Sequence, residues 1–258
     1  MSLDVEQFVT YQIANAPVLA YPFPHFYVHP VFPEEFFAAL RARMPGTQGY
    51  VRLDETGTVP KGSYPERFVC SLTDLEEEEF QADAGGFWAG FNQWIGGAAF
   101  ARLIMFKFRE GIAERFGSGN ELRTTTDLRL VRDITNYSIS PHTDSPRKLV
   151  SLLFYLPADE SMLDLGTSIY APKDPALRCE GNGHHPFEGF KKVATMPYRP
   201  NSLFAFLKTD QAFHGVDRIE RERVTRDLLL YNIYVDKVVG QKPEKPARPR
   251  LAWPWQRA

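Results

Sequence analysis

Cysteine is scarce in this sequence: Cys70 and Cys179 are the only two among 258 residues. They lie far apart and form no C-x-x-C pair, so the sequence contains neither a disulfide framework nor a thiolate cluster for zinc. The first residues, MSLDVEQ, also lack the basic and apolar regions of a secretory signal. Isolated thiols without such a signal are typical of a reducing compartment, and we therefore expect a cytoplasmic protein.

The sequence also lacks a long apolar run and an excess of charge of either sign. A helix that spans a bilayer needs about 20 consecutive apolar residues, and no stretch here is that long, so we expect no membrane attachment. The formal net charge is −2, which gives no basic footprint for nucleic acid. Phosphate-binding loops of the Walker or G-x-G-x-x-G type are absent as well. The expected partner is a small molecule.

The first half of the chain has helical features. Residues 33–44 begin with proline, continue with two glutamates and place apolar residues at helical spacing. Residues 87–116 predict one or two helices that break at Gly96 and Gly97, with an aromatic stripe that we expect to face the core. The acidic run 74–79 is typical of the start of a further helix, with its carboxylates in solvent. Between these segments, residues 46–71 indicate long loops and one short strand around residues 68–70.

From residue 122 onward, short apolar runs alternate with proline and glycine turns, a pattern typical of strands. The predicted strands cover residues 122–132, 148–156, 167–171, 191–195, 202–207, 213–216 and 225–235. Helices followed by antiparallel strands favour an α+β fold, with a double-stranded β-helix (jelly-roll) core and N-terminal helices that brace one sheet. We expect a single domain over residues 1–258: a mainly helical part to residue 121, the core over 122–236 and an extended tail over 237–258.

A short polar motif stands at the centre of the strand-rich half. His142 and Asp144 are two residues apart and would lie on the same side of a strand, where both can reach one metal ion. His214 follows much later, after another apolar strand. Two imidazoles and one carboxylate are the ligand set that holds Fe(II) on one face and leaves other positions open. Arg226, at the head of the apolar run 228–234, adds a cation that suits a dicarboxylate bridging the metal and the guanidinium.

This pattern resembles the Fe(II)- and 2-oxoglutarate-dependent oxygenases, and in particular their prolyl-hydroxylase-like branch. The shared elements are the H-x-D triplet, the distal His-Gly-Val at residues 214–216 and the basic residue that opens the next strand. The similarity extends over residues 128–235 and is weaker over residues 22–36. The resemblance implies that His142, Asp144 and His214 ligate Fe(II), and that Arg226 binds the distal carboxylate of the cosubstrate 2-oxoglutarate. No catalytic side chain beyond the metal centre is predicted.

The sequence departs from the family pattern around the cosubstrate. Members of this branch usually have a tyrosine on the strand before H-x-D, whereas the equivalent position here falls near Arg132 and Asp133. Tyr137 and Lys148 are the candidates to replace it. Leu228 also occupies a position that the family tends to give to Ser or Thr. Arg223 competes with Arg226 for the anchoring role, but it belongs to a charged turn, and we prefer Arg226.

The resemblance further implies a reaction that converts 2-oxoglutarate and O2 to succinate and CO2 while a substrate is hydroxylated. Asp144 fills the position that halogenases of this class leave to chloride, so hydroxylation is preferred; desaturation and epimerisation share the ligand set and stay open. The modest charge and many aromatic residues favour a small metabolite, a sugar derivative or an amino acid as substrate. The alternative is a cupin-like metal-binding isomerase, or a ligand-binding protein, that does not use 2-oxoglutarate. Arg226 discriminates, because such a protein has no need of a cation there.

Two segments outside these elements bear on the site and on assembly. Residues 173–189 form a long insertion between strands, and such insertions more often cover a site than fill a core. The insertion contains His184 and His185, whose side chains diverge because they are adjacent, so metal binding by this pair is not favoured. The proline-rich tail predicts an exposed extended segment. Trp253 and Trp255 within it need a surface, on this chain or on a second copy, so a homo-oligomer stays open.

Overall fold

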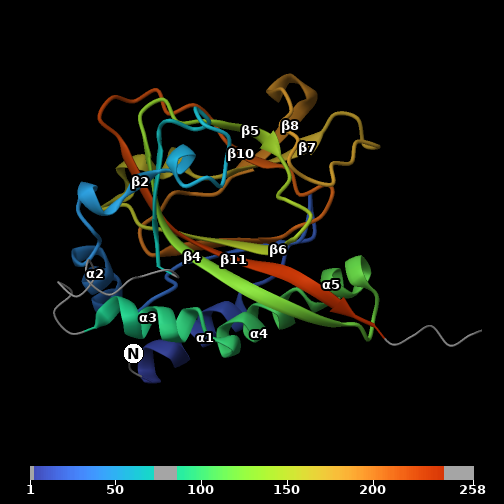
Figure 1. Cartoon of the computed structure of the whole chain (residues 1–258), viewed down its shortest axis with the longest axis horizontal. Helices are drawn as coiled ribbons and strands as arrows, with labels where there is room; N and C mark the ends of the chain where they lie inside the picture. The colour runs from blue at the N-terminus through green and yellow to red at the C-terminus, as the bar shows by residue number, and fades with distance from the viewer. Residues whose placement is uncertain (1–2, 73–85, 241–258) are drawn as a thin grey trace, which may run out of the picture.

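The structure, a computed structural model, describes residues 3–72 and 86–240 and consists of two antiparallel sheets with helices on one side (Figure 1). The helices are α1 (Leu3–Asn15), α2 (Glu34–Ala42), α3 (Phe87–Ile95), α4 (Ala98–Lys107) and α5 (Arg109–Phe116), with short 3-10 helices at Thr47–Gly49, Leu53–Glu55, Glu160–Leu165 and Phe187–Gly189. Among the described residues no helix is long and apolar enough to cross a bilayer.

The larger sheet has seven strands in the order β1-β9-β6-β11-β4-β3-β2, and the smaller has four in the order β5-β10-β7-β8. The strands are β1 (His25–Val28), β2 (Val51–Arg52), β3 (Arg67–Ser71), β4 (Glu121–Ile134), β5 (Ile139–His142), β6 (Lys148–Tyr155), β7 (Ser168–Pro172), β8 (Phe190–Thr195), β9 (Ser202–Leu207), β10 (His214–Val216) and β11 (Thr225–Val239). From β4 onward the chain passes back and forth between the sheets, except that β7 and β8 are neighbours in the smaller sheet; β4, β6, β9 and β11 belong to the larger sheet and β5, β7, β8 and β10 to the smaller.

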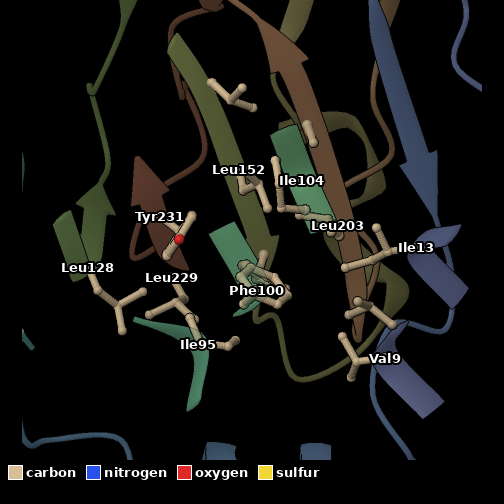
Figure 2. Packing of buried hydrophobic residues seen from close by; sticks show 14 of the residues in the cluster. Val9, Ile13, Ile95, Phe100, Ile104, Leu128, Leu152, Leu203, Leu229 and Tyr231 are labelled. Atoms are coloured by element: carbon tan, nitrogen blue, oxygen red, sulfur yellow. The ribbon is translucent and has the colours of Figure 1, made fainter. Parts of the chain in front are cut away.

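One apolar core lies between the large sheet and the helices. In Figure 1 helices α1, α3 and α4 lie along the outer face of strands β4, β11 and β6. Figure 2 shows residues of this core: Val9 and Ile13 of α1 and Phe100 and Ile104 of α4 approach Leu152, Leu203, Leu229 and Tyr231 of the sheet. The labelled aliphatic and aromatic side chains of α1 and α4 have exposures of 4% or less. Burial on this scale explains why the helices brace the large sheet, as the sequence predicts.

A second apolar cluster lies between the two sheets and is rich in tyrosine. It contains Tyr137, Tyr155 and Tyr198, each fully buried, together with Phe204 and Phe206 of β9. Because buried hydroxyl groups need partners, two of these tyrosines hydrogen bond to backbone atoms: Tyr155 Oη accepts from the Thr167 amide at 3.0 Å, and Tyr198 Oη donates to the Asp227 carbonyl at 2.8 Å. This inner cluster surrounds the polar site described below.

The observed elements match the sequence-based expectations in kind and differ in detail. Each of the seven predicted strands is present, and the mixture of helices and antiparallel sheets is as expected. The segment 87–116 forms three helices, because the chain breaks a second time at Phe108. Helix α1 and strands β1 and β2 were not predicted. The acidic run 74–79 and the tail beyond residue 240 lie outside the described residues.

Candidate metal centre and adjoining pocket

His142, Asp144 and His214 come together in the structure. His142 at the end of β5 is directly opposite His214 at the start of β10, and their ring centroids are 4.3 Å apart. The three potential ligand atoms lie within 4.8 Å of one another, and among the described residues no other group of three His, Cys, Asp or Glu is placed to hold a metal. The chemistry of this donor set suits Fe(II).

His142 and Asp144 were expected to share a strand, but β5 ends at His142 and Asp144 lies in the loop that follows. The loop turns at once into β6, because the Lys148 amide closes a turn onto the Ser145 carbonyl at 3.0 Å. Thr143 Oγ1 donates to the Cys179 carbonyl at 2.7 Å and holds the segment in place. Asp144 therefore reaches the cluster from a braced loop.

Both imidazoles are oriented by the backbone. Nδ1 of His142 donates to the Ser140 carbonyl at 3.0 Å, and Nδ1 of His214 donates to the Ala212 carbonyl at 3.0 Å. This bond fixes the tautomer with the lone pair on Nε2, as is usual for histidines that ligate metals. Nε2 of His214 lies 4.0 Å from Oδ1 of Asp144. The two rings thus present their acceptor nitrogens beside the carboxylate, which is the arrangement that an Fe(II) ion requires.

The Asp144 carboxylate is held by two donors. Nζ of Lys148 bonds to Oδ1 at 2.9 Å, and Oγ of Ser151 bonds to Oδ2 at 2.7 Å. Burial alone would raise the pKa of Asp144, but the Lys148 ammonium and the Ser151 hydroxyl lower it below its usual range. The carboxyl group is therefore ionised and ready to bind a cation at neutral pH.

Burial also keeps both imidazoles neutral. It lowers the pKa of His142 well below 6.5, with a further contribution from His214, and it lowers the pKa of His214 against the opposing effect of Asp144. A neutral imidazole is the form that ligates a metal, so protons compete for these ligands only at lower pH than usual.

From these shifts we expect the Mn(II) affinity of the apoprotein to change little between pH 8 and pH 6.5. Two imidazoles with ordinary pKa values of about 6.5 would each be half protonated at the lower pH and would weaken binding about fourfold. Isothermal titration calorimetry in matched buffers measures the difference. A fourfold or larger loss at pH 6.5 would show that the imidazoles titrate normally.

A pocket of about 90 Å³ adjoins the cluster and extends between the sheets. Its lining includes the three candidate ligands, Lys148, Ser151, Phe206, Thr167, Tyr137, Arg67 and Arg226. The pocket thus joins the cluster to two guanidinium groups, one of which is Arg226.

Arg226 is fully buried and held from three directions. Its Nε donates to the Leu165 carbonyl at 2.6 Å, one terminal nitrogen to Oδ2 of Asp133 at 2.7 Å, and the other to Oγ1 of Thr167 at 3.2 Å. The rings of Tyr155 and Tyr198 lie 5.7 and 5.5 Å from its guanidinium carbon. These three bonds use three of the five N–H donors of the guanidinium.

The competing candidate, Arg223, lies elsewhere. It is exposed on the turn before β11 and has a left-handed backbone conformation with φ of 56°. Of these two arginines, Arg226 alone lines the pocket.

Two charged residues next to Arg226 were not predicted from the sequence: Arg67, which lines the pocket, and Asp133, which lies behind it and binds both arginines. Arg67 of β3 binds Asp133 with two parallel hydrogen bonds, Nε to Oδ1 at 2.7 Å and a terminal nitrogen to Oδ2 at 2.9 Å. Asp133 is the register partner of Arg67 in β3 and of Arg226 in β11, so the three residues form one row across adjacent strands. The only sequence signal was that Arg67 opens the short apolar run at residues 68–70, in a segment that otherwise indicates loops.

The two residues named as substitutes for the family tyrosine have different surroundings. Tyr137 is fully buried beneath the Arg67 guanidinium, which lies 4.3 Å from its ring, and its hydroxyl has no hydrogen-bond partner among the described residues. Burial raises the pKa of Tyr137, so the hydroxyl carries its proton. Lys148 is bonded to Asp144, as described above. Tyr137 is therefore the candidate with an unused donor.

The insertion of residues 173–189 reaches the metal cluster. His184 forms an isolated backbone bridge with His142, and its ring stacks on that of His142 at a centroid distance of 4.9 Å. Its Nε2 is hydrogen bonded to the Tyr64 hydroxyl at 2.8 Å, and His184 does not belong to the metal cluster. The insertion and the segment before β3 thus meet beside the cluster.

No family model and no curated protein matches the sequence. The fold is similar to that of a prolyl-4-hydroxylase from Pseudomonas putida, with a TM-score of 0.50 and 14% identity over 88% of this chain and 96% of the other. An oxidoreductase of the 2OG-Fe(II) oxygenase family from Burkholderia pseudomallei matches with a TM-score of 0.46 and 12% identity over 89% of each chain. The 2-oxoglutarate-dependent epimerase SnoN from nogalamycin biosynthesis matches with a TM-score of 0.49 and 13% identity, over 95% of this chain and 90% of that one. The resemblance predicted from the motif is confirmed at the level of the fold.

Proposed function

We propose that this chain is an Fe(II)- and 2-oxoglutarate-dependent dioxygenase that hydroxylates a small metabolite, a sugar derivative or an amino acid. Succinate and CO2 would be the co-products. The observation that carries the proposal is that one pocket joins a two-histidine, one-carboxylate cluster to a fully buried arginine. Strands β4 to β11 would form the double-stranded β-helix core (jelly roll) of a single catalytic domain.

In this proposal His142, Asp144 and His214 hold the iron through two imidazole nitrogens and one carboxylate oxygen. When bound, iron and 2-oxoglutarate supply the activation of O2 by oxidative decarboxylation of the cosubstrate. Lys148 and Ser151 keep the Asp144 carboxylate ionised and oriented. The backbone carbonyls of Ser140 and Ala212 keep Nε2 of each histidine directed at the metal.

Arg226 would anchor the distal carboxylate of 2-oxoglutarate. A guanidinium matches the geometry of a carboxylate and would donate hydrogen bonds to the anion in this buried position. Its three bonds to Leu165, Asp133 and Thr167 pre-orient it, so little side-chain entropy is lost on binding. The ion pair with Asp133 accounts for the burial of Arg226, and its place in the pocket lining is what favours a dicarboxylate ligand.

Tyr137 provides a test of the cosubstrate pocket. Replacing Tyr137 by phenylalanine is expected to weaken 2-oxoglutarate binding about tenfold, because a hydrogen bond to a charged group contributes about 1.5–3 kcal/mol. The free protein should be as stable as the wild type or more stable, since the hydroxyl is buried without a partner. Calorimetric titration and urea unfolding measure the two effects. Unchanged affinity with lowered stability would assign Tyr137 to the core alone.

The proposed function is tested by adding Fe(II) and 2-oxoglutarate to the apoprotein without oxygen. Chelation of the cosubstrate by the metal is expected to produce a weak metal-to-ligand charge-transfer absorption, and aeration should then release succinate. Absence of both signals from folded protein would contradict the proposal and favour a cupin-like protein that does not use 2-oxoglutarate. If both signals are observed, a screen of metabolites for stimulated succinate formation would identify the substrate.

A further inference from the structure

We propose that Arg67 sets the charge of the cosubstrate pocket: by sharing Asp133 with Arg226, it leaves one net positive charge for the distal carboxylate of the ligand. Arg67 would thus be a positioning residue that acts through Asp133. The inference rests on the proposed function, because it concerns the same pocket and the same dicarboxylate.

The geometry places one carboxylate between two guanidinium groups. Arg67, Asp133 and Arg226 occupy one row across strands β3, β4 and β11. Oδ2 of Asp133 accepts from both arginines, at 2.9 Å from Arg67 and 2.7 Å from Arg226, and Oδ1 accepts from Arg67 at 2.7 Å. The Asp133 and Arg226 side chains are fully buried, and that of Arg67 is 18% exposed. Solvent screens such a group less than it screens exposed charges.

The balance of charge explains why Arg67 is needed. Arg226 and Asp133 alone would form a neutral pair, and a neutral pair offers little attraction to an anion that must give up its hydration on entering a closed pocket. Arg67 raises the net charge of the group from zero to +1, which matches one carboxylate. Among the described residues that line the pocket, the remaining charged pair, Lys148 and Asp144, is bonded to itself at 2.9 Å.

Arg67 also lies where it can act without being the main contact of the ligand. Two of its nitrogens are directed at Asp133, and its guanidinium covers the ring of Tyr137 at 4.3 Å. Arg226 is more deeply buried than Arg67 and lines the same pocket. The two arginines thus have different roles: Arg226 contacts the distal carboxylate of 2-oxoglutarate, and Arg67 compensates the charge of Asp133.

The test measures affinity for 2-oxoglutarate in protein loaded with Mn(II), using calorimetry without oxygen. Arg67→Gln should weaken binding at least tenfold, because the group becomes neutral. Adding Asp133→Asn to this variant removes the opposing charge, so the double variant should return to within about threefold of the wild type. Affinity for 2-oxopentanoate, which lacks the distal carboxylate, should be the same in all three proteins, and so should affinity for Mn(II).

Arg132→Gln is the matched control. Arg132 also binds an aspartate of the neighbouring strand, Asp227, at 2.7 Å, and its side chain is 18% exposed like that of Arg67, but it does not line the pocket. This variant should bind 2-oxoglutarate as the wild type does.

The outcomes separate this inference from the proposed function. No binding of 2-oxoglutarate by the wild type would overturn both. Binding by the wild type, with equal binding by Arg67→Gln or with no recovery in the double variant, would overturn the role of Arg67 alone. If Arg67→Gln does not fold, Asp133→Asn alone decides: its pocket has a charge of +2 and should bind 2-oxoglutarate at least as tightly as the wild type. A tenfold weaker affinity in that variant would contradict the inference.

Discussion

The Asp144→Asn variant is expected to lose more metal affinity than the roughly 10–100-fold that changes around a ligand typically cause, because it alters the ligand itself. It should also release no succinate from 2-oxoglutarate above background. The amide is neutral, so the charge that attracts the cation is lost. In the wild type, Lys148 and Ser151 donate to the two carboxylate oxygens, and in the variant one of these donors would face the NH2 group, which cannot accept. Mn(II) titration and succinate analysis measure the two losses.

A matched control for this variant is Asp236→Asn. Asp236 pairs with Arg147 at 3.0 Å on the protein surface, with both side chains at least 36% exposed, so the same chemical change there should leave metal affinity unchanged. If Asp144→Asn bound Mn(II) within threefold of the wild type, Asp144 would not be a ligand and the cluster would have to be reassigned.

The Arg226→Met variant is expected to lose at least 100-fold in affinity for 2-oxoglutarate and to keep its affinity for Mn(II). Methionine fills much of the space but removes the cation and its N–H donors, and hydrogen bonds to charged groups contribute about 1.5–3 kcal/mol each. Breaking a buried ion pair costs about 3–5 kcal/mol of stability, and the lower end applies here because Arg67 still binds Asp133. Calorimetry and urea unfolding measure the two effects.

Arg223→Met serves as the control for Arg226→Met. Arg223 is exposed on the turn three residues earlier and lies outside the pocket, so the variant should match the wild type in both measurements. An unchanged 2-oxoglutarate affinity in Arg226→Met would assign the anchor to another residue. A loss in Arg223→Met instead would reverse the choice between the two arginines.

The sequence could predict the candidate ligands because the information is local. An H-x-D triplet between strand-like runs places two ligands close together, and a histidine at the head of a later strand is a natural third. The bracing loop was not predictable: Asp144 leaves the strand because the chain turns at Ser145, and Thr143 is fixed by the distant insertion. The cluster forms by these contacts, and not by the alternation of one strand.

The charged row around Asp133 lay beyond sequence reasoning for a different reason. Arg67, Asp133 and Arg226 meet only through the register of three strands, and the strand that carries Arg67 is five residues long in a loop-rich segment. Register is set by pairing across the sheet, which a single sequence does not display. The position where the family pattern has a tyrosine lies on β4, which here contributes the Asp133 carboxylate. Arg67 of the neighbouring strand β3 binds that carboxylate.

The fold was predictable where apolar residues are dense and not where they are sparse. Strands β6 and β9 are almost continuously buried, as are most residues in the first half of β11, and their apolar runs are evident in the sequence. Helix α1 was missed because it buries only Val9 and Ile13, too few to produce a clear helical period. Strand β1 was missed because it has only four residues, follows a proline-rich stretch, and forms by pairing with β9, which is distant in the sequence.

The most direct test of the account is a crystal structure of the protein grown with Mn(II) and 2-oxoglutarate, with the metal located by its anomalous scattering. We expect one strong anomalous peak within bonding distance of His142 Nε2, an Asp144 carboxylate oxygen and His214 Nε2. We also expect 2-oxoglutarate between this peak and Arg226, with the distal carboxylate on the guanidinium. A peak away from these three residues, or a well-occupied metal with the dicarboxylate bound elsewhere, would contradict this account.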